Sequence, residues 1–276
     1  MNFFKYKKFF LIFFLTSFLS GCHEGIFFPS GMVALKQRNL ILLSFFLMLV
    51  IIIPVIFMTL FFSYKYRHTS KNKDYDPNWN HSYIIEGFSW GVPILIIFFL
   101  SILSWKETHN LDPRKPLTKN VSPIKIEVIS LNWKWLFIYP EQKIITINEL
   151  VIPTNSPIEF YITSNSVMNS FFIPSLGSQI YSMPGMTSKL NLISNFPGIY
   201  KGISSNYSGS GFSDMKFKVI STTDYNFFSS WVKKVKKIGK KILNFNDFKK
   251  IYKNKFKKYF SYDDLFLIEK YIKKGN

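Results

Sequence analysis

Cysteine and histidine are scarce in this sequence, and their positions exclude several kinds of site. Cys22 is the only cysteine among 276 residues, so an intramolecular disulfide and a multi-cysteine metal site are ruled out. The four histidines (His23, His68, His81 and His109) all precede residue 110. The long segment after them therefore cannot hold a Ser-His-Asp hydrolase site or a histidine-based zinc site.

Acidic residues are also few, with 16 Asp and Glu against 35 Lys and Arg and a formal net charge of +19. The excess of basic over acidic residues is concentrated in residues 232–276, which carry 15 lysines and four acids. A basic tail in a chain with long apolar runs favours contact with anionic lipid or an acidic partner subunit over nucleic acid. The plainer interpretation of these lysines is that the whole chain favours Lys, Asn, Ile, Phe and Tyr, so that many lysines have no specific partner. This alternative stays open.

The first 21 residues have the layout of a lipoprotein-type signal peptide. Lys5, Lys7 and Lys8 form a positive region, and Phe9–Leu19 is an apolar run too short to span a bilayer. Leu19-Ser20-Gly21-Cys22 resembles the bacterial lipobox, in which the cysteine is acylated and becomes the mature N-terminus. One acylated residue adds membrane affinity but is a marginal anchor on its own.

Two apolar runs, residues 40–62 and 84–105, are predicted to span the membrane. The first carries no charge and is about 34 Å long as a helix, which matches the thickness of a bilayer. With Cys22 outside, two spans return the chain to the outside, so residues 22–39 and the C-terminal part are extracytoplasmic. The loop 63–83, with its four basic residues, then faces the cytoplasm.

Glu86 lies in the first turn of the second span and has two interpretations. It is either a carboxylate that reaches water and is favoured by the helix dipole, or a residue of a proton path. Its position alone slightly favours the first.

Beyond Pro113 the apolar residues alternate over short stretches separated by Pro, Asn, Gly and Ser, which is typical of a β-sandwich. Residues 120–222 are therefore predicted to form one Greek-key domain. In one strand, Ile158, Phe160 and Ile162 are predicted to face one side, and Glu159, Tyr161 and Thr163 the other. The Lys-rich segment 223–276 is predicted to be helical, with breaks near Gly239. The expected strands are 124–130, 133–139, 143–147, 158–163, 189–194, 199–204 and 216–221.

Two motifs in this domain resemble subunit II of the haem–copper respiratory oxidases. They are WKWLFIYPE (133–141) and SNSVMNSFFIPSLGSQIYSMPGM (164–186), and the order of signal, hairpin and β domain is similar along essentially the whole chain. The resemblance implies a cupredoxin-like fold for the β domain. In the cytochrome c oxidase branch, that domain holds a dinuclear copper centre.

The copper ligands of that branch are replaced here. The resemblance places its first histidine at Asn169, its cysteines at Ser204 and Ser208, its second histidine at Phe212 and the bridging glutamate at Asn206. Only Met215 is retained, and core packing is its expected role. Copper centres of this kind require thiolates, so no metal is expected in this chain. Gly209 and Gly211 are expected to serve the tight turning of the loop.

The copper-less branch comprises the quinol oxidases of the cytochrome bo type, to which SVMNSFFIPSLGSQIY is similar. The resemblance implies a non-redox subunit of a proton-pumping ubiquinol oxidase in the bacterial inner membrane, with haems and copper in subunit I. Its implied partners are subunits I, III and IV and membrane lipid, with neither nucleic acid nor cytochrome c among them. It also favours a proton-path role for Glu86. The alternative is a membrane-tethered lipoprotein with a cupredoxin-like binding domain.

Overall fold

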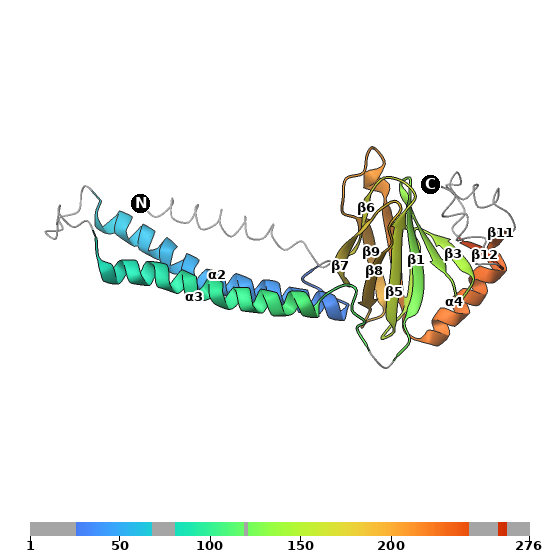
Figure 1. Cartoon of the computed structure of the whole chain (residues 1–276), viewed down its shortest axis with the longest axis horizontal. Coiled ribbons are helices and arrows are strands. Elements are labelled where there is room, and N and C mark those ends of the chain that lie inside the picture. The colour runs from blue at the N-terminus through green and yellow to red at the C-terminus, as the bar shows by residue number, and fades with distance from the viewer. Residues whose placement is uncertain (1–25, 68–80, 119–120, 243–258, 264–276) are drawn as a thin grey trace, which may run out of the picture. The chain divides into compact units, whose positions relative to one another are not determined.

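The computed structural model describes residues 26–67, 81–118, 121–242 and 259–263, and its contacts divide the chain into two units. One unit, residues 36–115, contains helix α3 (Tyr83–Asn110) and most of helix α2 (Met32–Lys65). The other unit contains the strands, helix α4 (Tyr225–Ile238) and the residues up to Leu35 (Figure 1).

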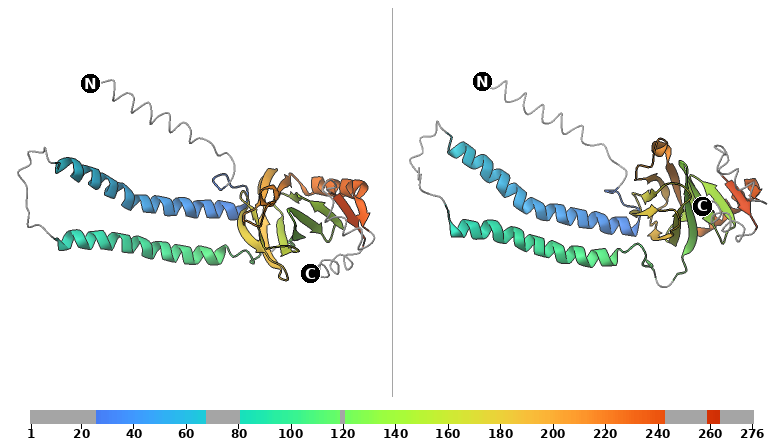
Figure 2. Two further views of the ribbon diagram at one scale, coloured as in Figure 1. Left: turned by 90° about the horizontal axis from the view of Figure 1, so that it is seen from above. Right: turned by 45° about the horizontal axis from the view of Figure 1, so that its top comes forward.

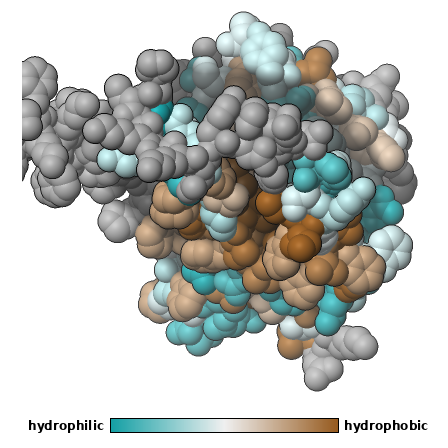
Figure 3. All heavy atoms as spheres, turned by 90° about the vertical axis from the view of Figure 1, so that its left-hand side faces the viewer, coloured by the Kyte–Doolittle hydropathy of each residue, from teal (hydrophilic) through white to brown (hydrophobic). Residues whose placement is uncertain are grey.

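Helices α2 and α3 are both long and apolar enough to cross a membrane. The predicted spans 40–62 and 84–105 lie inside them, and each helix contains one proline. Figure 2 shows both as long ribbons joined by the segment drawn in grey. Their large apolar side chains are exposed, as expected of helices surrounded by lipid or partner helices. Brown, hydrophobic side chains accordingly occupy much of the face seen in Figure 3.

The β domain is a sandwich of two sheets, which confirms the predicted cupredoxin-like architecture. Strands β1 (Ile124–Leu131) and β5 (Pro157–Ser164) pair in parallel in one sheet, and β4 (Glu149–Pro153) and β10 (Lys216–Thr222) do so in the other. The seven-stranded sheet has the order β11 (Lys240–Ile242), β12 (Tyr259–Tyr262), β3 (Ile144–Ile147), β2 (Lys134–Tyr139), β1 (Ile124–Leu131), β5 (Pro157–Ser164), β8 (Ser188–Ile193). The five-stranded sheet has the order β4 (Glu149–Pro153), β10 (Lys216–Thr222), β9 (Gly198–Ser204), β6 (Asn169–Ile173), β7 (Gly177–Ser182).

Aromatic side chains fill the space between the sheets. Phe171 of β6 stacks on Phe217 of β10, with ring centroids 5.1 Å apart, and it also contacts the rings of Trp135, Phe137 and Phe160. All five side chains are almost fully buried. Ile158, Phe160 and Ile162, which were predicted to share one side of β5, have no exposed surface.

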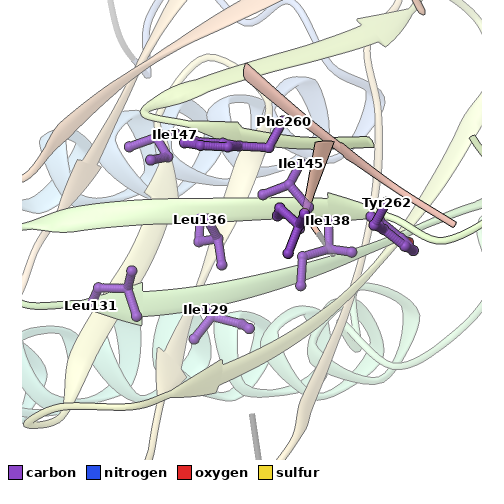
Figure 4. Packing of buried hydrophobic residues seen from close by; sticks show 9 residues of the cluster. Ile129, Leu131, Leu136, Ile138, Ile145, Ile147, Phe260 and Tyr262 are labelled. Atoms are coloured by element: carbon purple, nitrogen blue, oxygen red, sulfur yellow. The ribbon is translucent and has the colours of Figure 1, made fainter. Parts of the chain in front are cut away.

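Strands β11 and β12 are an addition to the predicted fold, because the segment after Gly239 was expected to be helical. Strand β12 pairs with β3, and it inserts Phe260 and Tyr262 into a buried cluster with residues of β1, β2 and β3 (Figure 4). The Tyr259 hydroxyl donates a 2.5 Å hydrogen bond to Glu149. The predicted helix at Phe227–Ile238 is confirmed as α4, whereas those expected around 245–256 and 263–272 lie almost wholly outside the described residues.

The residues just before α2 are attached to the β domain. The backbone N–H groups of Ser30 and Gly31 donate to the carbonyl of Ser175, at 2.7 and 3.1 Å, and Ser30 accepts from the N–H of Asn195. A Cβ at Gly31 would lie 2.7 Å from the Leu176 carbonyl oxygen, so only glycine fits this close approach. The first helical turn of α2 thus belongs to the β domain.

Candidate functional site

The positions predicted as lost copper ligands lie at one end of the five-stranded sheet. Strand β6 begins at Asn169, and its pairing with β9 aligns Phe171 with Ser204, where β9 ends. The loop 205–215 leaves from Ser204 and returns to Met215, whose carbonyl accepts a 3.2 Å hydrogen bond from the Ser204 N–H. Sheet pairing therefore brings together Asn169, Ser204 and Met215, which are distant in sequence.

Asn169 and Ser204 are buried and bonded to each other. The Ser204 hydroxyl donates to the side-chain oxygen of Asn169 at 3.4 Å, and the Asn169 amide group donates to the Val167 carbonyl at 3.0 Å. Asn169 is 1% exposed and Ser204 is 5% exposed. The hydrogen bonds offset the cost of burying these polar groups.

Three further serines extend this polar cluster between the sheets. The Ser130 hydroxyl of β1 lies 3.4 Å from the Asn169 amide nitrogen, and it donates to Ser164 of β5 at 2.7 Å. Ser182 of β7 donates to the same Ser130 hydroxyl at 3.0 Å. With Asn169 of β6 and Ser204 of β9, five strands thus contribute to one buried network of neutral groups. Ser164 and Ser182 lie within the second motif (164–186), but nothing in the motifs or their spacing singled out these three serines.

The remaining ligand positions lie in the loop, and each has contacts of its own. The Asn206 amide donates to the Met168 carbonyl at 3.4 Å, and the Phe212 ring contacts Tyr207 with centroids 5.7 Å apart. The Ser208 hydroxyl is buried and has no hydrogen-bond partner among the described residues. Met215 is fully buried, as expected for a residue that packs in the core.

Trp133 lies over the glycines of the loop. A Cβ at Gly209 would come within 2.7 Å of its indole, and one at Gly211 within 2.3 Å. Gly209 has a φ of +119°, so the tight turn expected there is present. Gly211 has an ordinary φ of −93°, and it is needed for the close approach of the indole rather than for a turn.

The donor atoms at these positions do not fit a dinuclear copper centre. They are hydroxyls, amides, a phenyl ring and one buried thioether, whereas such a centre needs bridging thiolates and imidazoles. The described residues also contain no group of three His, Cys, Asp or Glu side chains placed to hold a metal ion. The hydrogen-bonded serines and Asn169 occupy the site instead.

Glu86 lies in the first turn of α3, where its backbone N–H donates to the Ser82 carbonyl at 2.9 Å. Its side chain is exposed, and Trp90, one turn later, is 72% exposed. Both side chains are free to meet another subunit or lipid. Cys22, the predicted lipidation site, lies outside the described residues.

Comparison with known proteins connects this geometry to a family. Residues 137–222 match the family model described as "Cytochrome C oxidase subunit II, periplasmic domain". The chain is 59% identical over 254 residues to the cytochrome bo(3) ubiquinol oxidase subunit 2 of Buchnera aphidicola subsp. Baizongia pistaciae, and the match covers 91% of this chain and 89% of that protein. The chain belongs to the ubiquinol oxidase subunit 2 family.

Two further known proteins are similar to the chain at lower sequence identity. The cytochrome bo(3) ubiquinol oxidase subunit 2 of Pseudomonas aeruginosa is 53% identical over 218 residues, covering 79% of this chain and 66% of that protein. Among solved structures, the periplasmic domain of subunit II of cytochrome oxidase from Bradyrhizobium japonicum is 23% identical, with a TM-score of 0.39 over 40% of this chain and 91% of that domain.

The two tryptophans of the WKW motif, at 133 and 135, have different roles in this subunit 2 chain. Trp135 is a fully buried core residue, whereas Trp133 has a left-handed φ of 61°, which turns its indole onto the loop. The sequence identified the motif but not this division of roles.

Proposed function

We propose that the chain is the non-redox subunit II of a proton-pumping ubiquinol oxidase in a bacterial inner membrane. In this complex, ubiquinol is oxidised and oxygen is reduced to water on subunit I, which holds the haems and the copper. The replacement of the thiolate positions by Ser204 and Ser208, beside the buried Asn169, is the observation that carries the proposal. A subunit without thiolates cannot take electrons from a soluble cytochrome through a dinuclear copper centre.

The chain itself contributes structure to the complex and no redox chemistry. Its two helices pack against subunit I, and its β domain lies over the outer surface of that subunit, with subunits III and IV completing the complex. The exposed apolar side chains of α2 and α3 support this role, because they supply packing surface for other membrane helices.

The attachment of Ser30 and Gly31 to Ser175 supports the proposed topology. Residues that precede α2 and residues of the β domain must lie on the same side of the membrane if their backbones are hydrogen-bonded. A hairpin of two spans satisfies this condition. Cys22 precedes Gly31 by nine residues, so its proposed acylation would take place on the same, periplasmic side.

Glu86 is proposed to lie near the entrance of a proton path into subunit I. Its exposed carboxyl lies at the start of α3, after the proposed cytoplasmic loop. Ionisable groups at membrane depth are costly and usually functional.

Oxygen uptake by the purified complex tests the function. The full chain, affinity-tagged and isolated from detergent-solubilised membranes, is expected to bring down a haem-bearing subunit and to consume oxygen with ubiquinol but not with reduced cytochrome c. Oxygen uptake with reduced cytochrome c would refute the proposal. A chain that purifies without a haem-bearing partner would instead support the solitary, membrane-tethered binding module.

A further inference from the structure

Three exposed phenylalanines lie where the segment before α2 meets the β domain. Phe27 and Phe28 are 60% and 51% exposed, and Phe196, in the turn between β8 and β9, is 61% exposed. Among the described residues of the β-domain unit, only one other phenylalanine, Phe227 of α4, is exposed. Single exposed apolar residues are normal, whereas several at one place indicate an interaction site. We call Phe27, Phe28 and Phe196 the phenylalanine patch.

Backbone hydrogen bonds hold the two parts of the patch together. The Asn195 N–H donates to the Ser30 carbonyl at 2.8 Å, and Gly31 forms an antiparallel bridge with Ser194. The Ser194 hydroxyl also donates to the Phe196 carbonyl at 3.0 Å. These bonds fix the turn against the N-terminal segment, so the exposed position of Phe196 is built into the domain.

Chain length places the patch close to the bilayer. Helix α2 begins one residue after Gly31, and the uncharged run of the first span begins at Leu40. Leu35, which is 42% exposed and belongs to the β-domain unit, precedes Leu40 by five residues, or about 8 Å of helix. The headgroup layer outside the hydrocarbon core is about 5–8 Å deep on each side of a bilayer. Leu35 is therefore at headgroup depth, and the patch lies a few residues before it.

The charges beside the patch favour a lipid surface as its partner. Residues 26–39 contain no Asp or Glu, and the turn 194–198 contains no charged residue. Asp224 lies at this end of the sheets too, but the turn between β4 and β5 separates it from Ser194. Lys36 and Arg38 stand between the patch and the uncharged run. Exposed apolar side chains next to basic residues are typical of segments that lie in the interface of an anionic membrane.

We infer that the phenylalanine patch, together with Leu35, inserts among the headgroups of the outer leaflet and holds this end of the β domain on the phospholipid surface. The inference rests on the proposed function and deepens it, because it names lipid rather than a subunit as the partner of this end of the domain. Insertion removes the exposed phenyl rings from water, which stabilises the contact. Lys36 and Arg38 then lie beside the lipid phosphates.

A spin label in the assembled oxidase tests the inference. Phe196→Cys is introduced into the full chain, and the purified complex is spin-labelled and reconstituted in nanodiscs of phosphatidylethanolamine and phosphatidylglycerol. Collisions of the label with oxygen, which concentrates in lipid, are compared with its collisions with a water-soluble nickel chelate. The complex without the new cysteine, labelled in parallel, gives the contribution of native thiols.

Phe227→Cys is the matched control. Phe227 is 63% exposed, and its helix α4 packs against β12, near the opposite edge of the seven-stranded sheet from β8. The oxygen-to-nickel collision ratio at residue 196 is expected to exceed the ratio at residue 227 several-fold. Adding Phe27→Asp should lower the ratio at residue 196, because an anionic surface repels the new carboxylate. Adding Phe27→Tyr, which keeps an aromatic ring suited to the interface, should leave it unchanged.

A ratio at residue 196 no higher than that at residue 227 would overturn the inference and leave a solvated patch. A label at residue 196 that collides with neither reagent would overturn it as well, because a protein surface would then cover the patch. An unchanged ratio after Phe27→Asp would count against it in the same way. Each of these results leaves the proposed function standing, provided that the complex retains its haem-bearing subunit and ubiquinol-driven oxygen uptake. Loss of those two properties from the wild-type complex would refute the proposed function, whatever the label reports.

Discussion

The Ser204 hydroxyl donates a hydrogen bond to the side-chain oxygen of Asn169, 3.4 Å away, at two positions that the sequence resemblance predicts to be lost copper ligands. The two residues come from neighbouring strands of one sheet, and both are buried. A neutral hydrogen bond thus joins two of the predicted ligand positions, and we interpret the loop as the scaffold of a lost metal site.

Restoring the ligand set should restore copper binding. Asn169→His, Ser204→Cys, Asn206→Glu, Ser208→Cys and Phe212→His, with Met215 retained, would return bridging thiolates and imidazoles to the preserved loop. We expect stoichiometric copper and a visible thiolate-to-copper absorption band in the purified full chain. The same variant with both Ser204 and Ser208 left unchanged is the control, and it should show neither, because it carries no thiolate in the loop. No copper uptake by the full set would contradict the preserved-scaffold interpretation.

A methyl group at residue 211 should destabilise the β domain. The Cβ introduced by Gly211→Ala would lie 2.3 Å from the Trp133 indole, and overpacking of this kind costs about 1–3 kcal/mol. Thermal unfolding of the full chain in detergent measures the loss. Gly198→Ala, whose Cβ would meet only the Tyr200 side chain at 3.4 Å, should have little effect. Adding Trp133→Ala to Gly211→Ala should recover part of the loss, and strict additivity of the two changes would refute the contact.

Gly31→Ala should loosen the attachment of the N-terminal segment. Its Cβ would lie 2.7 Å from the Leu176 carbonyl oxygen and 2.8 Å from that of Ile193, and neither backbone atom can give way easily. We expect faster hydrogen exchange at the Gly31 and Asn195 amides and a stability loss of about 1–3 kcal/mol. Gly87→Ala in α3, with nothing within 4 Å, is the matched control. Unchanged exchange at both amides would contradict the attachment.

The carboxylate of Glu159 should make stability fall at acid pH. Burial disfavours its charged form, but hydrogen bonds from Lys189 and Tyr161 and the Lys189 charge outweigh burial, so the pKa of Glu159 lies below its usual value of 4.5. A depressed pKa in the folded state means that the stabilisation is present above pH 4.5 and is lost as pH falls below it toward the folded-state pKa.

The contribution of this pair is about 1 kcal/mol or less, because the Lys189 side chain is 39% exposed and screened by solvent. Denaturant unfolding at a series of pH values should show a shallower loss of stability below pH 4.5 for Glu159→Gln than for the wild type. Identical acid profiles would show that the ion pair contributes nothing.

Replacing Glu86 should slow the oxidase without preventing its assembly. Glu86→Ala removes an exposed carboxyl at the start of α3, so we expect reduced ubiquinol-driven oxygen uptake with normal haem content. Glu86→Asp should retain more activity than Glu86→Ala. Glu107→Gln, near the other end of the same helix, controls for general effects on α3. Unchanged turnover of Glu86→Ala would return this residue to a merely solvated role.

Regular patterns in the sequence predicted much of the fold. Uninterrupted apolar runs predicted both membrane helices, and alternation predicted seven of the strands. Strands β4, β6 and β7 were not predicted. β4 (ELVIP) and β6 (NSFFI) are buried along nearly their whole length, so they show no clear alternation of apolar and polar residues. Strand β12 is a different case, because it pairs with β3 across more than a hundred residues and no local pattern indicates that partner.

The sequence by itself determined that no copper centre of the oxidase type can form, because that conclusion needs only the identity of the residues at the ligand positions. Only the tertiary structure decided what replaced it. Ser130, Ser164 and Ser182 come from three strands, and they meet Asn169 because sheet packing places them together. Local periodicity reflects which face of a strand is buried, whereas partners across two sheets are set by long-range packing that no local pattern encodes.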